Sequence, residues 1–361
     1  MPVDASCFSP DYIAARARFR SSTMALASSG LKPELHAWGI GQTGPDGEEL
    51  TIDVAVLGAK HAEKVVVVSS GLHGVEGFMG SAMQAALLEE TFPKNPPPAN
   101  TRVVLLHALN PYGFAFVRRV NEDNIDLNRN FLLPDEPYAG SPEGYEELDG
   151  LLNPPHPPSS FEPFLAKAVF AIVRKGLPAL KNSVAGGQYD FPKGLFFGGH
   201  APSRTMSLLD QHLPGLVGDK ARVFHIDFHS GLGKKGTYKL LVDHEVGAPG
   251  AEQLVKRFGD DVQPWDKTGV SYTIRGGMGK WAKHKFGDRY DVLAAEFGTV
   301  NVIANIRGMR TENQVFHYGG PNHPWHKRSK EMFMGVFAPA DRTWRDEVVP
   351  KGVAIVERAL A

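Results

Sequence analysis

Cysteine is almost absent from this sequence, since Cys7 is the only one among 361 residues. A single cysteine excludes an internal disulfide framework and any metal site built from several cysteines. The chain also lacks a stretch of about 20 apolar residues, the length that a membrane-spanning helix requires. Its N-terminal segment has neither the basic start nor the apolar core of a secretory signal. We therefore expect a soluble cytoplasmic protein with no membrane partner.

An excess of either charge is absent as well. Lys and Arg together number 39 and Asp and Glu together 40, which gives a formal net charge of -1. Proteins that bind nucleic acids normally carry a basic excess or a basic stripe, so we expect no nucleic-acid partner. The 42% of hydrophobic residues suffices for a large core in one domain or two.

Two metal-capable side chains follow directly after an apolar run in the segment VVVVSSGLHGVEG. Val65 to Val68 is typical of a buried strand, and Phe78 to Glu90 has the length and alanine-leucine content of a helix. His73 and Glu76 therefore lie on a loop between strand and helix. In open α/β sheets, ligands bind just beyond the carboxyl ends of strands, which is where this loop is placed.

A third ligand is needed, because catalytic zinc sites commonly combine two His and one Glu with an open position for water. The segment VFHIDFHSG, residues 223–231, alternates like a strand and carries His225, Asp227 and His229 on one face. His229 stands at the carboxyl end, so we favour it over His225 as the ligand. His225 and Asp227 are expected to pack in the core or to support the ligand.

These motifs resemble those of the zinc carboxypeptidase superfamily, which includes aspartoacylase and succinylglutamate desuccinylase. The resemblance is greatest to a bacterial metallopeptidase-like branch whose members mostly lack an assigned substrate. Four pieces occur in the order that the superfamily uses: His73-Gly-Val-Glu76, Asp126-Leu-Asn128-Arg129, His229 in DFHSG, and Glu296 in LAAEFGT.

The resemblance implies that His73, Glu76 and His229 bind one zinc ion with water as the fourth ligand, and that Glu296 is the general base. The position of Glu296 fits this role independently of the resemblance. The glutamate interrupts an apolar strand, residues 292–298, and an unpaired buried carboxylate is costly.

Further residues take roles from the same resemblance. Asn128 and Arg129 match the pair that grips a carboxylate of the substrate, and a planar guanidinium suits that task. Arg119, favoured over its neighbour Arg118, matches the arginine that polarises the scissile carbonyl. Asp126 matches the carboxylate that accepts a hydrogen bond from the first zinc-binding histidine.

The superfamily often adds a mobile tyrosine to the pocket. Tyr272 is our candidate, while Tyr238 and Tyr189 remain open. Ordinary structural roles also remain open for several site residues. Arg129 could pair with acidic neighbours beside a capped turn, and His229 could be a core histidine.

Alternating strand and helix patterns predict a three-layer α/β/α sandwich with a mixed, largely parallel twisted sheet. The resemblance implies that this fold is of the zinc carboxypeptidase type. We expect one domain over residues 1–361, because the predicted ligands and base are scattered along the chain. Residues 132–163 look like a surface excursion with one short helix. Residues 186–199 form either a pocket wall or a packed loop, and residues 306–328 are expected to be loop and surface.

The sequence thus predicts a zinc hydrolase that cleaves an amide bond next to a carboxylate-bearing group, using a metal-activated water and a glutamate base. The substrate is either a short peptide, as for a carboxypeptidase, or a small N-acyl amino acid, as for a deacylase. The alternative is a non-catalytic binding or regulatory module on the same fold. A homo-oligomer is possible.

Overall fold

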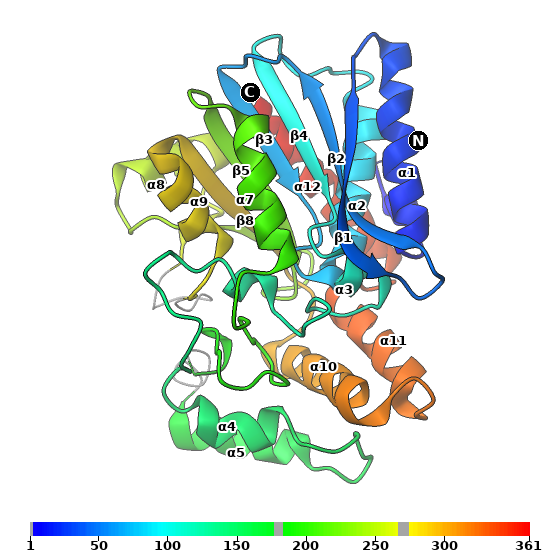
Figure 1. Ribbon diagram of the computed structural model, residues 1–361, viewed down its shortest axis with the longest axis vertical. Coiled ribbons are helices and arrows are strands. Elements are labelled where there is room, and N and C mark those ends of the chain that lie inside the picture. Colours follow the sequence, from blue (N-terminus) through cyan, green and yellow to red (C-terminus); the bar gives the residue numbers. More distant parts are fainter. Residues whose placement is uncertain (1–2, 177–182, 266–273) are drawn as a thin grey trace.

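The computed structural model describes residues 3–176, 183–265 and 274–361. Within these residues, eight strands form one sheet in the order β1-β2-β4-β3-β5-β8-β6-β7 (Figure 1). The strands are β1 (Glu34–Thr43), β2 (Glu49–Gly58), β3 (Lys64–Ser69), β4 (Thr101–His107), β5 (Arg222–Ser230), β6 (Tyr238–Val242), β7 (Val262–Pro264) and β8 (Tyr290–Phe297).

The centre of the sheet is parallel and its flanks are mixed. Strands β4, β3, β5 and β8 run parallel to one another, while β2 is antiparallel to both β1 and β4, and β6 is antiparallel to β8. The carboxyl ends of the four central strands therefore meet at one edge, at the lower end of the sheet in Figure 1. This arrangement confirms the predicted mixed, largely parallel sheet.

Helices cover both faces of the sheet. Buried side chains of α2, α8 and α12 pack on one face, and those of α7 and α9 pack on the other. The described α-helices are α1 (Tyr12–Ala25), α2 (Gly77–Ala86), α3 (Pro111–Ala115), α4 (Tyr145–Leu152), α5 (Phe164–Lys175), α7 (Arg204–Val217), α8 (Pro249–Phe258), α9 (Met278–Phe286), α10 (Val302–Gln314), α11 (Trp325–Phe337) and α12 (Arg342–Leu360). None of them combines the length and the apolar character needed to cross a membrane.

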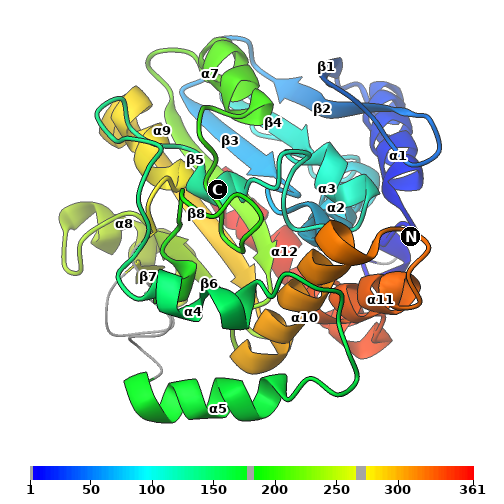
Figure 2. The same cartoon turned by 60° about the horizontal axis from the view of Figure 1, so that its bottom comes forward.

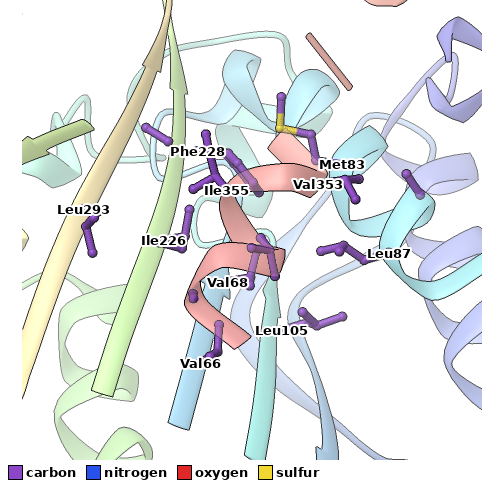
Figure 3. Close-up of a cluster of buried hydrophobic side chains, with 14 of the residues drawn as sticks. Val66, Val68, Met83, Leu87, Leu105, Ile226, Phe228, Leu293, Val353 and Ile355 are labelled. Atoms are coloured by element: carbon purple, nitrogen blue, oxygen red, sulfur yellow. The ribbon is translucent and has the colours of Figure 1, made fainter. Parts of the chain in front are cut away.

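Strand β3 shows why the sequence forms this layered core. Its valines alternate between the two faces: Val65 and Val67 join one buried cluster, and Val66 and Val68 join the other. A central strand covered by helices on both sides is apolar throughout, as this one is. Figure 3 shows Val66 and Val68 on the face of the sheet that α12 covers, in the same buried cluster as Val353 and Ile355 of that helix. Full burial of each valine contributes roughly 1.5–3 kcal/mol of transfer free energy.

A third apolar cluster lies beyond the carboxyl ends of the strands, where α4 and α10 meet. In Figures 1 and 2, α4, α5 and α10 gather on this side of the molecule. The short helix expected within residues 132–163 is present as α4. The expectation of loop and surface for residues 306–328 is wrong, because α10 and α11 occupy most of that range. Val302, Ile306 and Met309 recur at helical spacing and line one pocket, and Ile306 and Met309 also belong to the third apolar cluster.

Candidate metal centre

The loop after β3 is held in place by its backbone. His73 precedes a single helical turn, Gly74–Glu76, from which α2 continues. The Gly74 N–H donates to the Arg119 carbonyl at 3.1 Å, and a Cβ on Gly74 would lie 2.0 Å from the Gly113 carbonyl carbon. Glycine thus permits a close approach that brings the loop and the segment carrying Arg119 together.

The structure brings the three predicted ligands together. His73, Glu76 and His229 are 4%, 1% and 3% exposed, and one ligand atom of each lies within 4.8 Å of the others. His73 Nδ1 and His229 Nδ1 are 3.2 Å apart, and the two Glu76 oxygens lie 3.0 and 3.1 Å from these nitrogens. Among the described residues, no other group of three or more His, Cys, Asp or Glu side chains converges in this way.

This donor set fits a zinc ion. Zinc in proteins binds imidazole nitrogens and carboxylate oxygens at about 2.0–2.2 Å in a tetrahedral arrangement, which separates neighbouring ligand atoms by about 3.3 Å. The observed 3.0–3.2 Å separations need only a small expansion to reach that value. Two imidazoles and one carboxylate also leave a fourth position, as catalytic zinc sites do.

Each histidine turns its second nitrogen to a carboxylate. His73 Nε2 lies 3.1 Å from Asp126 Oδ1, and His229 Nε2 lies 2.6 Å from Asp227 Oδ2. For His229, the Asp227 carboxylate favours a proton on Nε2, which leaves Nδ1 to face a metal. His73 Nε2 also lies 2.8 Å from Arg119 Nη2. Burial alone would lower the pKa of His229, but the Asp227 and Glu76 carboxylates raise it well above its usual value. Asp126 therefore lies beside His73, and its role in orienting that ring stays a prediction.

The sequence left open whether Asp227 and His225 pack in the core or support the ligand. In the structure Asp227 contacts the ligand His229. The two ring nitrogens of His225 bond Ser69 Oγ at 2.7 Å and the Tyr290 hydroxyl at 2.9 Å. The Ser69 hydroxyl in turn donates to Asp227 Oδ1 at 2.5 Å. Burial lowers the pKa of His225 to about 4, so this histidine is a neutral core residue.

The neighbouring residues Arg118 and Arg119 extend to different parts of the structure. Arg119 donates from Nε to Asp126 Oδ2 and from Nη1 to Glu76 Oε1, each at 3.1 Å. Arg118 is buried elsewhere, where it donates to Glu312 Oε1 at 3.0 Å. The structure therefore brings Arg119 to the ligands and leaves Arg118 outside, although the catalytic role of Arg119 stays a prediction.

Asn128 and Arg129 line the pocket above the ligands. The Arg129 guanidinium donates from Nε and Nη2 to the Ala185 carbonyl and from Nη1 to the Asn128 carbonyl. Asp126 caps the same short turn by accepting from the Asn128 N–H at 3.1 Å. The capped turn that the sequence left open is thus present, and Arg129 donates to carbonyls beside it. Gripping of a carboxylate by Arg129 stays a prediction.

Glu296 approaches the ligands from the neighbouring strand. It pairs in register with His229 across β5 and β8, and its Oε1 accepts a hydrogen bond from the Leu232 N–H at 2.9 Å. Burial, with a further contribution from the Glu76 carboxylate, raises the pKa of the Glu296 carboxyl to about 7. A half-buried carboxyl on the pocket wall with this pKa is suited to exchange protons near neutral pH.

The tyrosine candidates receive no support. Tyr189 is buried and donates to the Arg129 carbonyl at 2.7 Å, and Tyr238 packs on Phe297. Neither lies in the pocket wall, and Tyr272 is outside the described residues.

Sequence reasoning missed much of that wall. Ile306 and Met309 of α10 line the pocket, and their helical spacing was the available signal. Phe196 lines it too, so residues 186–199 supply part of the wall.

A family model described as "Protein of unknown function (DUF2817)" matches residues 8–351. The chain belongs to this family. No curated protein sequence matches this DUF2817 chain.

Solved structures similar to this DUF2817 chain include carboxypeptidase A from Helicoverpa armigera, at 13% identity and a TM-score of 0.53 over 97% of this chain and 73% of that one. An aspartoacylase family protein from Mesorhizobium loti matches at 15% identity and a TM-score of 0.38 over 80% and 67% of the two chains. The succinylglutamate desuccinylase from Chromobacterium violaceum matches at 14% identity and a TM-score of 0.39 over 88% and 76%. The first of these shows that the fold is carboxypeptidase-like.

Proposed function

We propose that this protein is a zinc-dependent hydrolase that cleaves an amide bond adjacent to a carboxylate-bearing group. One observation carries the proposal: the His73, Glu76 and His229 ligand atoms converge in a pocket whose wall also presents Glu296. Hydrolysis by an activated water requires a site that can bind a metal and, beside it, a carboxyl whose pKa lies near neutral pH.

Each residue of the site then has a separate role in the proposed hydrolysis. When bound, zinc supplies a lowered pKa for water and polarises the amide carbonyl. Glu296 accepts a proton from the attacking water and delivers it to the amine nitrogen as the C–N bond breaks, which yields a carboxylic acid and an amine. Arg119 lies where its guanidinium can turn toward the developing oxyanion, and Asp126 and Asp227 fix the two imidazoles.

The substrate carboxylate is assigned to Asn128 and Arg129. Both line the pocket beside the ligands, and a guanidinium matches a carboxylate in charge and shape. A short peptide with a free C-terminus and a small N-acyl amino acid both satisfy this assignment, so the proposal covers both substrate classes.

Metal content and turnover together test the proposal. Elemental mass spectrometry of the purified protein should find about one equivalent of zinc, and the His229→Ala variant should lose it. The zinc-loaded protein should hydrolyse members of a panel of N-acyl amino acids and short peptides. Absence of zinc even after incubation with the metal would refute the hydrolase and favour a non-catalytic binding module.

Glu296→Gln separates catalysis from metal binding. The variant should retain zinc and lose activity by about 100-fold or more, because an amide cannot accept the proton. Glu357→Gln, an exposed change on α12, is the matched control and should behave as wild type. Turnover of Glu296→Gln near the wild-type rate would remove Glu296 as the base.

A further inference from the structure

An apolar cavity of about 150 Å³ adjoins the candidate ligands. Its far wall is built by α4, α5 and α10, which lie on the same side of the molecule in Figure 2. Leu148 and Leu152 of α4, Ile172 of α5 and Met309 of α10 are among the side chains that form it. The helices that create the cavity thus come from two segments far apart in the sequence, the excursion after residue 132 and the chain after β8.

Charge is confined to one end of this cavity. Every charged side chain that lines it belongs to the candidate site, namely Glu76, Arg119, Arg129 and Glu296 with the two histidines. Beyond these, the described wall residues are apolar except Asn128, Ser230 and Asn305. Asn128 belongs to the candidate site, and Ser230 and Asn305 bond the Phe337 and Gly231 carbonyls. A charged or strongly polar substrate group placed there would lose its hydration without gaining a partner.

A second cavity, of about 490 Å³, meets the site from the side of α9 and has a different character. His229 and Asn128 border both cavities, whereas Asp243, Glu245, Lys280 and Lys283 line only the second. Of the three ligands, His229 therefore stands between an apolar compartment and a more polar one. A substrate cleaved at this junction meets unlike walls on the two sides of its amide bond.

We infer that the substrate carries a large apolar group, which binds in the cavity between α4, α5 and α10. The inference rests on the proposed hydrolase and names its substrate class: carboxylate-bearing amides with a ring-sized or branched hydrocarbon substituent. A cavity of about 150 Å³ lined by aliphatic and aromatic side chains holds a group as large as benzene. The substituent belongs either to the acyl part or to the amine part, and both present the same hydrocarbon surface to the wall.

Two substrate series distinguish these sources. One varies the acyl group of N-acyl glycines from acetyl through butanoyl to phenylacetyl, and the other varies the amino acid of N-acetyl derivatives from glycine through leucine to phenylalanine. Each methylene group buried should raise kcat/KM about fourfold, so one series should rise at least tenfold from its smallest to its largest member. Turnover that is flat across both series, or highest for the smallest members, overturns the inference.

Two pairs of variants on α5 test whether the cavity causes this preference. Ala171 lines the cavity and Ala166 of the same helix is exposed, so Ala171→Phe fills the space and Ala166→Phe adds the same ring outside it. Ile172 lines the cavity, whereas the adjacent Val173 is 79% exposed, so Ile172→Asp and Val173→Asp form a second pair.

The inner variant of each pair should lose the preference for large groups by at least tenfold while keeping turnover of the smallest substrate within about threefold. The outer variants should match wild type. Equal effects of the inner and outer changes in both pairs would place the apolar group elsewhere and overturn the inference.

Failure of the hydrolase itself would look different. If the zinc-loaded protein cleaves no member of either series, the proposed function fails, and calorimetry with phenylacetate and acetate then tests the cavity alone. Binding of phenylacetate at least tenfold tighter than acetate, lost in Ala171→Phe, would support the cavity as an apolar binding site. Equal affinities would overturn that as well.

Discussion

Each candidate metal-binding histidine is constrained at both ring nitrogens. Nδ1 faces the other ligands, and Nε2 faces a carboxylate, Asp126 for His73 and Asp227 for His229. The two rings are therefore oriented before any metal arrives, which lowers the cost of assembling the site. The Ser230 N–H adds a hydrogen bond to Glu76 Oε2 at 3.1 Å and fixes the third ligand.

Asp227→Asn should lower the affinity for zinc by about 10–100-fold, because the amide no longer stabilises the Nε2 proton of His229 as a carboxylate does. Competition against a chelator of known affinity measures this change. Asp291→Asn is the matched control, since Asp291 contacts His244 outside the site at 2.6 Å. An equal loss in both variants would attribute the effect to general destabilisation and contradict the role of Asp227.

The pH dependence should follow Glu296. Its carboxyl has a pKa raised to about 7 by burial and by Glu76, and the positive charge of zinc would lower that value. A general base works only when ionised, so kcat/KM should rise with pH and level off above a midpoint at or below about pH 7. A rate that falls as the pH increases from 5 to 7 would contradict the assignment.

At the scale of elements, the loop between β3 and α2 depends on close backbone packing. The Gly74 N–H and the Val75 N–H donate to the Arg119 and Arg118 carbonyls, at 3.1 and 2.8 Å. This pairing links the turn that carries two ligands to the segment that carries Arg119. A displacement of either segment would therefore move both the ligands His73 and Glu76 and the side chain of Arg119.

Gly74→Ala should therefore lower the free energy of unfolding by about 1–3 kcal/mol, because its Cβ would meet the Gly113 backbone at 2.0 Å. Urea unfolding measures the loss. Gly335→Ala on α11 is the control: a Cβ there meets nothing within 4 Å, and removal of a helical glycine should add about 0.5–1 kcal/mol of stability. Equal stability of Gly74→Ala and wild type would show that the loop tolerates the added methyl group.

On the scale of the whole molecule, a bound metal would join distant parts of the chain. His73 and Glu76 follow β3, whereas His229 ends β5, and these strands are neighbours at the centre of the sheet. A ligand that binds only the folded state stabilises it in proportion to the logarithm of its free concentration over its dissociation constant. The metal should thus hold the central strands together at their carboxyl ends.

Removal of zinc should consequently lower the thermal midpoint. At a free zinc concentration of 1,000 times the dissociation constant, the metal adds about 4 kcal/mol of stability. Scanning calorimetry of the zinc-loaded and the chelator-treated protein measures the shift, and His229→Ala should show little difference between the two conditions. Identical midpoints for the loaded and stripped wild-type protein would contradict a specific site.

The amino-acid sequence by itself indicated three strands at the centre of the sheet, the layered fold and the candidate ligands. Alternating valines and helical spacing are local patterns, and a strand end followed by His73 and Glu76 is readable without knowing what lies opposite. His229 followed from its place at the end of a strand pattern, and the resemblance added Asp126 and the role of Glu296 as base. The single-domain assignment and the roles of the site residues remain predictions.

Only the tertiary structure decided which groups meet. It assigned Asp227 to His229, separated Arg119 from Arg118, and placed α10 with α4 and α5 around an apolar cavity. These contacts join residues that are distant in the chain, and a short sequence window carries no information on which neighbour a side chain will reach. The substrate preference inferred here depends on that long-range packing, because the cavity exists only where these helices come together.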